Sequence, residues 1–258
     1  LTSDEKGNAY LYGTFENNSE VTVKYRGATL KTYKFSKETE NAKSYALDAT
    51  VISANSAEEI KSAIKQEVAN SKTAIILNLA SDAGDNEFKT IREAFKNVRG
   101  YGTIDLTLIG CKEIPANGLY DRTGALAALK SITLPDVTKI GKNALSDCSE
   151  LQEICAPNVS AIDEYAFGEC NNLSKVTFGE LTDVRGKANS RGIFDEIYNS
   201  THYIELHLPK NQQVMQGEFD ENSNQYIWKP MGENYFASSD FDNGIFLGYQ
   251  FNSVKSWE

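Results

Sequence analysis

The chain has 258 residues, 40% of them hydrophobic, and a formal net charge of -10, of which nine units fall in residues 129–258. No stretch approaches the roughly 18 consecutive apolar residues that a membrane span requires, and no apolar segment with a basic flank opens the sequence. Because binding to a phosphate backbone depends on clustered Lys and Arg, the acidic half disfavours nucleic acid and anionic membrane surfaces as partners. The charge is compatible with cationic and neutral partners.

Residues 1–50 predict a small antiparallel β module followed by a linker. Two alternating runs, 21–25 and 29–35, flank a turn at Arg26-Gly27. The polar stretch 37–50 has no clear period, and we take it as the linker.

Residues 51–102 predict helices that alternate with strands. Ser56 and Glu59 form a capping box, which predicts a helix over 56–70. The run 74–79 is typical of a buried strand, and a second helix is indicated by the spacing of Phe88, Ile91, Phe95 and Val98.

A further strand is predicted at 103–108, and its apolar residues align with those of 74–79 at an offset of 29 residues. This alignment places Ile104 level with Ile75. The chain therefore returns through a full helix between the two strands.

A 22-residue repeat follows, with copies that begin at Leu129 and Leu151 and a third that opens at Leu173. Seven positions are identical in the two full copies, and all of them are apolar, small or turn-forming: Leu129/Leu151, Ile132/Ile154, Pro135/Pro157, Val137/Val159, Ile140/Ile162, Ala144/Ala166 and Cys148/Cys170. Such a repeat predicts a solenoid in which each turn buries its apolar side against its neighbours.

The repeat extends in both directions from these copies. Upstream, Leu106, Leu108 and Ile114 match Ile132, Leu134 and Ile140, with about four residues inserted near Gly124. Downstream, beyond an insertion at 186–192, Phe194 takes the place of Phe167, and the places of Leu129, Ile132, Leu134 and Pro135 are taken by Tyr203, Leu206, Leu208 and Pro209. We count five to six turns.

The string L-x-x-I-x-L-P-x-x-V-x-x-I-x-x-x-A-[LF]-x-x-C in residues 129–170 resembles the BspA-type leucine-rich repeat of bacterial surface and secreted proteins. The resemblance covers about residues 100–210. It implies an α/β fold, a leucine-rich-repeat solenoid with one short parallel strand per turn, a helical amino-terminal cap over 51–102 and repeats over 103–210. It also implies export and a role in adhesion or binding, and it carries no catalytic motif.

The tail, residues 211–258, is predicted to form a carboxy-terminal cap within the second domain, 51–258. Asn243-Gly244 predicts a two-residue hairpin turn, with Ile245, Leu247, Tyr249 and Phe251 alternating on the returning strand. The tail is rich in aromatic residues, which suit either a carbohydrate or protein platform or the covering of the last turn.

Side chains that flank the inward residues of each strand point outward, because side chains alternate across a strand. The predicted outward row opens with Ile76 and Asn78. Its candidate binding residues are Asp105, Thr107, Ser131, Thr133, Glu153, Cys155, Lys175, Thr177, Glu205 and His207. The row is either a ligand-binding face or an ordinary solvated sheet surface, since it lacks the aromatic and Arg anchors that dominate binding energy.

The four cysteines are predicted from their repeat positions. Cys148 and Cys170 are equivalent and one turn apart, which allows either two stacked thiols or a disulfide. Cys111 occupies the place of Val137 and is predicted to be core, whereas Cys155 is an exposed thiol in the outward row.

No catalytic signature is present, and we expect neither an enzyme nor a metal or other cofactor. His202 and His207 are the only histidines. A metal site built from Cys155 and His207 would need ligands two turns apart. The cluster around Asp240 and Asp242 has its Gly one position too early for a calcium loop, which favours a turn.

We therefore expect a non-catalytic, exported protein, monomeric, that mediates protein or glycan binding or adhesion at the bacterial cell surface. Its expected partner is a host or matrix protein or a glycan, with no nucleic acid and no membrane insertion. Because the chain starts at Leu1, a removed leader or a lipid anchor, including one in the outer membrane, stays open. The alternatives are a structural spacer without a ligand and, more remotely, a hydrolase.

Overall fold

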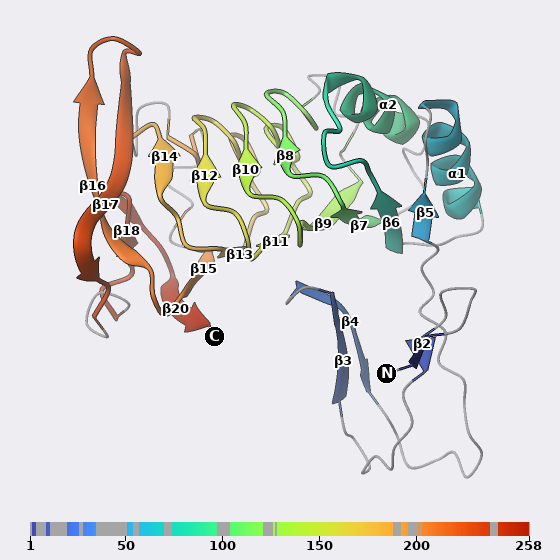
Figure 1. Ribbon diagram of the computed structural model, residues 1–258, viewed down its shortest axis with the longest axis horizontal. Coiled ribbons are helices and arrows are strands. Elements are labelled where there is room, and N and C mark those ends of the chain that lie inside the picture. The colour runs from blue at the N-terminus through green and yellow to red at the C-terminus, as the bar shows by residue number, and fades with distance from the viewer. Residues whose placement is uncertain are drawn as a thin grey trace.

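The computed structural model is a stack of repeat turns whose strands form two main sheets (Figure 1). The structure describes residues 2–3, 9–10, 20–25, 28–34, 51–53, 57–69, 74–96, 104–120, 126, 128–187, 192–195, 201, 203–237 and 242–257. Up to residue 53 this description covers the backbone only.

The main sheet has eight strands in the order β20-β15-β13-β11-β9-β7-β6-β5, and every neighbouring pair is parallel. Its strands are β5 (Val51–Ser53), β6 (Ala74–Asn78), β7 (Ile104–Ile109), β9 (Leu129–Thr133), β11 (Glu153–Ala156), β13 (Lys175–Phe178), β15 (Glu205–Pro209) and β20 (Ser253–Trp257). The predicted α/β solenoid with one parallel strand per turn is thus confirmed.

The second sheet has one short strand per turn. Parallel strands β8 (Glu113–Ile114), β10 (Lys139–Ile140), β12 (Ala161–Ile162) and β14 (Asp183–Arg185) are followed by the antiparallel hairpin of β16 (Gln213–Asp220) and β17 (Gln225–Tyr235). In Figure 1 this hairpin stands at one end of the solenoid.

The opposite end carries the two helices, α1 (Ala57–Ala69) and α2 (Asp85–Lys96) (Figure 1). Both predicted helices are confirmed, and Val98, predicted for the second, lies outside the described residues. They bury the apolar side chains that their spacing predicts, including Ile60 and Ile64 of α1 and Phe88, Ile91 and Phe95 of α2. No described helix is long and apolar enough to cross a membrane.

The predicted offset between the first two full strands is wrong by two residues. Ile75 pairs with Leu106 and Leu77 with Leu108, an offset of 31 residues. On the other side of β7, Ile104 pairs with Leu129 of β9 and Asp105 pairs with Ser131, so β9 has one extra residue at this point. Because the error is an even number, each side chain keeps its predicted face.

The predicted repeat core is confirmed, since the apolar residues at the identical positions are at most 1% exposed. Aromatic residues continue the stack toward the carboxy terminus. The Phe167 ring lies 5.6 Å from that of Phe178 and 5.4 Å from that of Phe194. Phe194 therefore takes the place of Phe167 in the following turn, as predicted.

Tyr203 does not occupy the Leu129 place, because its side chain is 69% exposed. Ile204 is buried there instead, and its N–H donates to Thr201 O, as the Leu151 N–H donates to Cys148 O. The last turn is one residue shorter between this position and Leu206 than the alignment assumes.

The carboxy-terminal hairpin turns at Leu247-Gly248 and not at the predicted Asn243-Gly244. Strand β18 (Ile245–Phe246) pairs with β19 (Tyr249–Gln250), and both turn residues have positive φ, 50° and 79°. These values fit a two-residue hairpin loop, and the cross-strand pairing leaves only Leu247 and Gly248 to form it. The chain then adds β20 to the main sheet, a strand that the sequence did not predict.

At the amino terminus, β1 (Thr2–Ser3) pairs with β2 (Ala9–Tyr10), and β3 (Glu20–Tyr25) pairs antiparallel with β4 (Ala28–Lys34). The predicted hairpin around Arg26-Gly27 is thus confirmed by its strands. The turn itself and the predicted linker at 37–50 lie outside the described residues.

Gln212 joins the β16–β17 hairpin to the last regular turn. Its side chain is fully buried. Its Oε1 accepts from the Leu181 N–H at 2.9 Å, and its Nε2 donates to Leu181 O at 3.2 Å and to Gln213 O at 2.8 Å. One amide therefore satisfies both backbone polar groups of Leu181.

The cysteines of the repeat are thiols, and none of the four in the chain forms a disulfide. Cys148 and Cys170 stack in the core, where the Cys170 Sγ lies 3.2 Å from Leu145 O. Burial raises the pKa of Cys111 and of Cys170 to about 12 and raises that of Cys148 well above its usual range.

We predict that Gln212→Ala lowers the free energy of unfolding by about 2–4 kcal/mol, because it leaves two buried backbone groups without partners at roughly 1–3 kcal/mol each. Urea unfolding followed by circular dichroism measures the change. Gln213→Ala, one residue along the chain, is the matched control and should shift stability by less than about 0.5 kcal/mol. Equal effects of the two changes would contradict the docking role of Gln212.

We also predict that thiol titration of the native protein at pH 8 labels at most one cysteine, Cys155, because the other three are buried and un-ionised. Titration in 6 M guanidinium should label all four. Fewer than four reactive thiols in the unfolded, unreduced chain would show a disulfide and contradict the thiol stack.

Candidate functional site

The main sheet brings the predicted outward residues together in two rows that run across its strands. Backbone pairing fixes the first row as Asp105, Ser131, Glu153, Lys175, Glu205 and Ser253. It fixes the second as Thr107, Thr133, Cys155, Thr177, His207 and Lys255. All ten predicted positions lie on this side of the sheet, which we call the outward face.

Two predicted members at the amino-terminal end are not surface residues. Ile76 is 5% exposed and Thr107 is 8% exposed, and the two are level with each other in the register. Asp105 is exposed, and the other predicted outward residues, which run from Ser131 on β9 to His207 on β15, are half-buried. Ile76 thus lies on the predicted side of the sheet but is buried there, whereas Asn78 is exposed as expected.

Part of the outward face lies against another segment of the chain. Cα atoms of β4 lie within 8 Å of those of both β9 and β11, although β4 belongs to a different sheet. The inner side of β9 and β11 is filled by the core, so β4 lies across their outer side. The part that extends from β13 through β15 to β20 continues beyond these two strands.

Charged side chains on the outward face pair with one another. Lys175 Nζ lies 2.7 Å from Glu153 Oε1, and this hydrogen bond raises the lysine pKa. Glu205 accepts hydrogen bonds from Lys255 and, at 2.5 Å, from His207. The Lys255 ammonium and then His207 hold the pKa of Glu205 below its ordinary value of 4.5.

Strand β20 contributes residues that the sequence analysis missed. Lys255 lies beside His207, and Trp257 follows two residues later, on the same side of the strand. Trp257 is half-buried, and its indole N–H donates to Phe178 O at 3.0 Å. The alternation around Val254 is the only signal that could have indicated this strand.

No group of three or more metal-binding side chains is found in the described part of the chain. Cys155 and His207 belong to β11 and β15, which are separated by β13. Strands are about 4.8 Å apart, so the backbones of these two residues lie roughly 10 Å apart.

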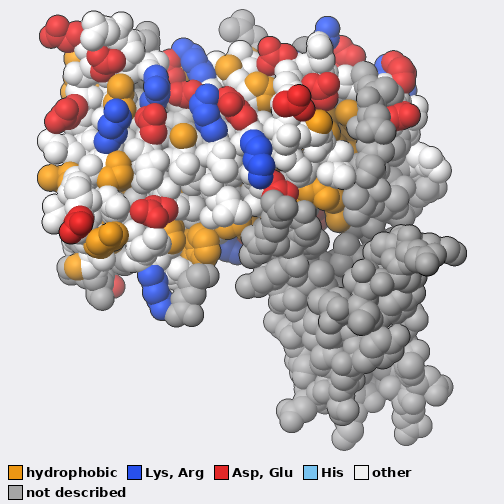
Figure 2. All heavy atoms as spheres, in the orientation of Figure 1, with side chains coloured by type: hydrophobic (Ala, Val, Ile, Leu, Met, Phe, Trp, Pro, Cys, Tyr) orange, Lys and Arg blue, Asp and Glu red, His pale blue; other side chains and the backbone are white. Residues whose placement is uncertain are grey.

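The second sheet presents a mixed charged face (Figure 2). Lys139 Nζ lies 2.7 Å from Glu113 Oε1, and Arg185 lies 3.2 Å from Asp163 and 3.8 Å from Asp183. Burial raises the pKa of Asp163, against the effect of Arg185. Opposite charges alternate here, so this face resembles a solvated surface with paired ions.

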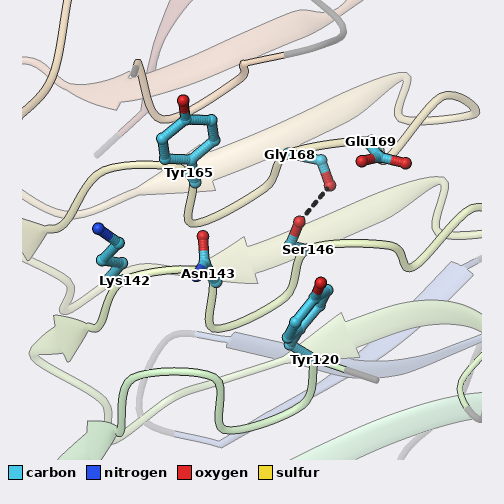
Figure 3. Close-up of a pocket in the computed structure, with 7 residues that line it drawn as sticks. All are labelled: Tyr120, Lys142, Asn143, Ser146, Tyr165, Gly168 and Glu169. Atoms are coloured by element: carbon cyan, nitrogen blue, oxygen red, sulfur yellow. Dashed lines mark hydrogen bonds between the residues drawn. The ribbon is translucent and has the colours of Figure 1, made fainter. Parts of the chain in front are cut away.

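A hollow of about 260 Å³ lies on a third side of the solenoid, where each turn runs from its short strand back to its long one (Figure 3). It is lined by Tyr120, Lys142, Asn143, Ser146, Tyr165, Gly168 and Glu169. The sequence analysis singled out none of these residues, because they occupy variable positions of the repeat.

We predict that NMR titration finds the Glu205 pKa below 4.5 and that Lys255→Met moves it up toward that value. A lowered carboxyl pKa stabilises the folded state above the unfolded value of 4.5, and this stabilisation is lost as the pH falls through the folded pKa. Lys229→Met, on the far hairpin, should leave the Glu205 pKa unchanged. An unshifted pKa in the Lys255 variant would show that the pair does not form in solution.

A profile of the family described as "BspA type Leucine rich repeat region" matches residues 112–243 in six copies. No curated protein matches the chain. Among solved structures, the crystal structure of a leucine-rich-repeat protein of T. pallidum is similar, with 22% identity and a TM-score of 0.34 over 43% of this chain. The match spans half of the length of that protein. With the profile matching just over half of the sequence, this chain belongs to the BspA-type leucine-rich-repeat family.

Proposed function

We propose that the chain is a non-catalytic, exported protein that binds a host or matrix protein at the bacterial cell surface. The observation that carries the proposal is the outward face. Backbone pairing holds its strands in register while its side chains differ from turn to turn. Extended sheet faces of this kind are where solenoids usually bind.

The part of the face from β13 to β20 supports this proposal best. It combines Lys175, Glu205, His207 and Lys255 with one aromatic side chain, Trp257. Trp is enriched among the residues that dominate binding energy at interfaces, and paired charges around such an anchor set orientation and specificity. A charged surface with a single aromatic side chain fits a protein partner better than a glycan.

The rival function is a structural spacer, which fits the internal pairing of the outward charges. A spacer has no specific partner and tolerates every outward substitution. Binding measurements distinguish the two functions directly.

We predict that surface plasmon resonance detects the full chain on at least one member of a panel of immobilised extracellular-matrix proteins. Trp257→Ala should weaken that binding at least tenfold, equivalent to about 1.4 kcal/mol. The triple change Glu153→Gln, Lys175→Met and Glu205→Gln should also weaken it, and should make it less sensitive to salt.

The second sheet supplies a matched control for the charged positions. Lys139 and Glu113 form a pair with the same 2.7 Å separation as Lys175 and Glu153. The double change Glu113→Gln and Lys139→Met should leave binding unchanged. Equal affinity of the outward-face variants and wild type would refute this face as the binding surface, and absence of binding across the panel would favour the spacer.

A further inference from the structure

The hollow on the turn side is built from equivalent positions of three successive turns. Backbone hydrogen bonds align Asn117 with Asn143 and Leu119 with Leu145, since Asn117 N–H donates to Lys142 O and Leu119 N–H to Ala144 O. By the same register, one column of side chains is Tyr120, Ser146 and Gly168, and its neighbour is Asn117, Asn143 and Tyr165.

Differences between the turns create the empty space. In the first column the side chain shrinks from a phenol at Tyr120 to a hydroxymethyl at Ser146 and to hydrogen at Gly168. In the second column the large side chain, Tyr165, is at the opposite end. Figure 3 shows the two rings on either side of the small residues. If the turns keep the strand spacing of about 4.8 Å, the rings belong to levels roughly 10 Å apart along the axis.

Two residues that line the hollow have an unfavourable backbone conformation. Tyr165 has φ of 58° and Glu169 has φ of 59°, in the left-handed region that favours Gly, Asn and Asp. The preceding turn has Asn143 and Asp147 at the equivalent positions, also with positive φ. The fold therefore favours this conformation in both turns, and the turn of Tyr165 and Glu169 places less suited side chains in it.

Such strain at a hollow points to function, since Asn and Asp would adopt this backbone conformation at lower cost. Both side chains line the same space. The strain is thus coupled to the shape and chemistry of the hollow rather than to the core.

The polar groups of the hollow are fixed in place. Lys142 forms an ion pair with Glu164, whose side chain is only 1% exposed. The amide of Asn143 donates to Asn117 Oδ1 at 3.1 Å, which orients its own oxygen away from Asn117, and Ser146 Oγ donates to Gly168 O at 3.1 Å. Glu169 adds a carboxylate at the far side.

We propose that this hollow binds a neutral oligosaccharide, with one sugar unit packed against Tyr120 and a second against Tyr165. Aromatic rings pack on the apolar face of a sugar, and amide, hydroxyl, ammonium and carboxylate groups bond its hydroxyls. Lys142 is already paired with Glu164, so the lining residues offer no unpaired cation to an anionic ligand. The volume is below the roughly 300–1,000 Å³ of pockets that hold drug-sized ligands, as suits one or two sugar units. This site is separate from the outward face.

The test is isothermal titration calorimetry of the full chain with maltotriose, cellotriose, lactose and N,N′-diacetylchitobiose. At least one of them should bind with a dissociation constant of about 1 mM or tighter. Tyr165→Asn restores the residue of the preceding turn and should weaken binding at least about tenfold while the melting temperature stays equal or rises.

A second variant fills the hollow without touching either ring. Gly168→Ser also restores the residue of the preceding turn, and its Cβ would lie 3.1 Å from Ser146 Oγ, a group that can rotate. It should reduce binding by a similar factor. Tyr235→Asn makes the same change at a 53% exposed tyrosine of β17. It is the matched control and should bind as wild type does.

Failure of all four sugars to bind, or wild-type affinity in both hollow variants, would overturn the proposal. Loss of folding in Tyr165→Asn would contradict the strain argument and leave Gly168→Ser to decide the site. The triple variant of the outward face should retain sugar binding, so the two proposals stand or fall separately.

Discussion

Each turn of the solenoid satisfies its backbone hydrogen bonds on neighbouring turns, and the rest of the molecule depends on this arrangement. The N–H of Leu145 donates to Ala166 O, that of Thr138 to Lys112 O and that of Gln152 to Lys130 O, each at 2.8 Å. A buried backbone group without a partner destabilises the fold, so no single turn is stable alone. The identical apolar positions of the repeat are the side-chain counterpart of the same constraint.

The two ends of the stack follow from this dependence, because a terminal turn has a neighbour on one side only. At the start, α1 and α2 cover the core with their apolar faces. At the other end the tail serves both sheets at once, since β17 pairs with β14 and β20 pairs with β15. Gln212 completes this junction by bonding both backbone polar groups of Leu181.

Sequence reasoning succeeded where a residue's role repeats and failed where it occurs once. Ile132 and Ile154 predict each other's burial, and the register of the whole outward face follows from their spacing. The tail offers no such repetition. Its hairpin turns at Leu247-Gly248 because of the strand pairing around it, and no local signal ranks that turn above Asn243-Gly244.

The same distinction, between features that repeat and features that occur once, explains which parts of the candidate sites were predictable. The outward face was predictable because side chains alternate along every strand, whereas its partial cover by β4 and its extension by β20 depend on contacts between distant segments. The hollow was not predictable from any single residue. Gly168 creates space only because it is level with Ser146, and this relation appears only when the turns are stacked.

Stacking also decides what kind of surface each set of side chains can form. Residues at one repeat position become neighbours about 4.8 Å apart, so opposite charges at one position, such as Glu153 and Lys175, pair with each other. A column whose side chains become smaller, such as Tyr120, Ser146 and Gly168, leaves a hollow. Neither outcome affects the core, because the core uses other positions. The repeat therefore lets binding surfaces change from turn to turn at constant fold, and the strain at Tyr165 and Glu169 marks a place where such a change opposes local backbone preference.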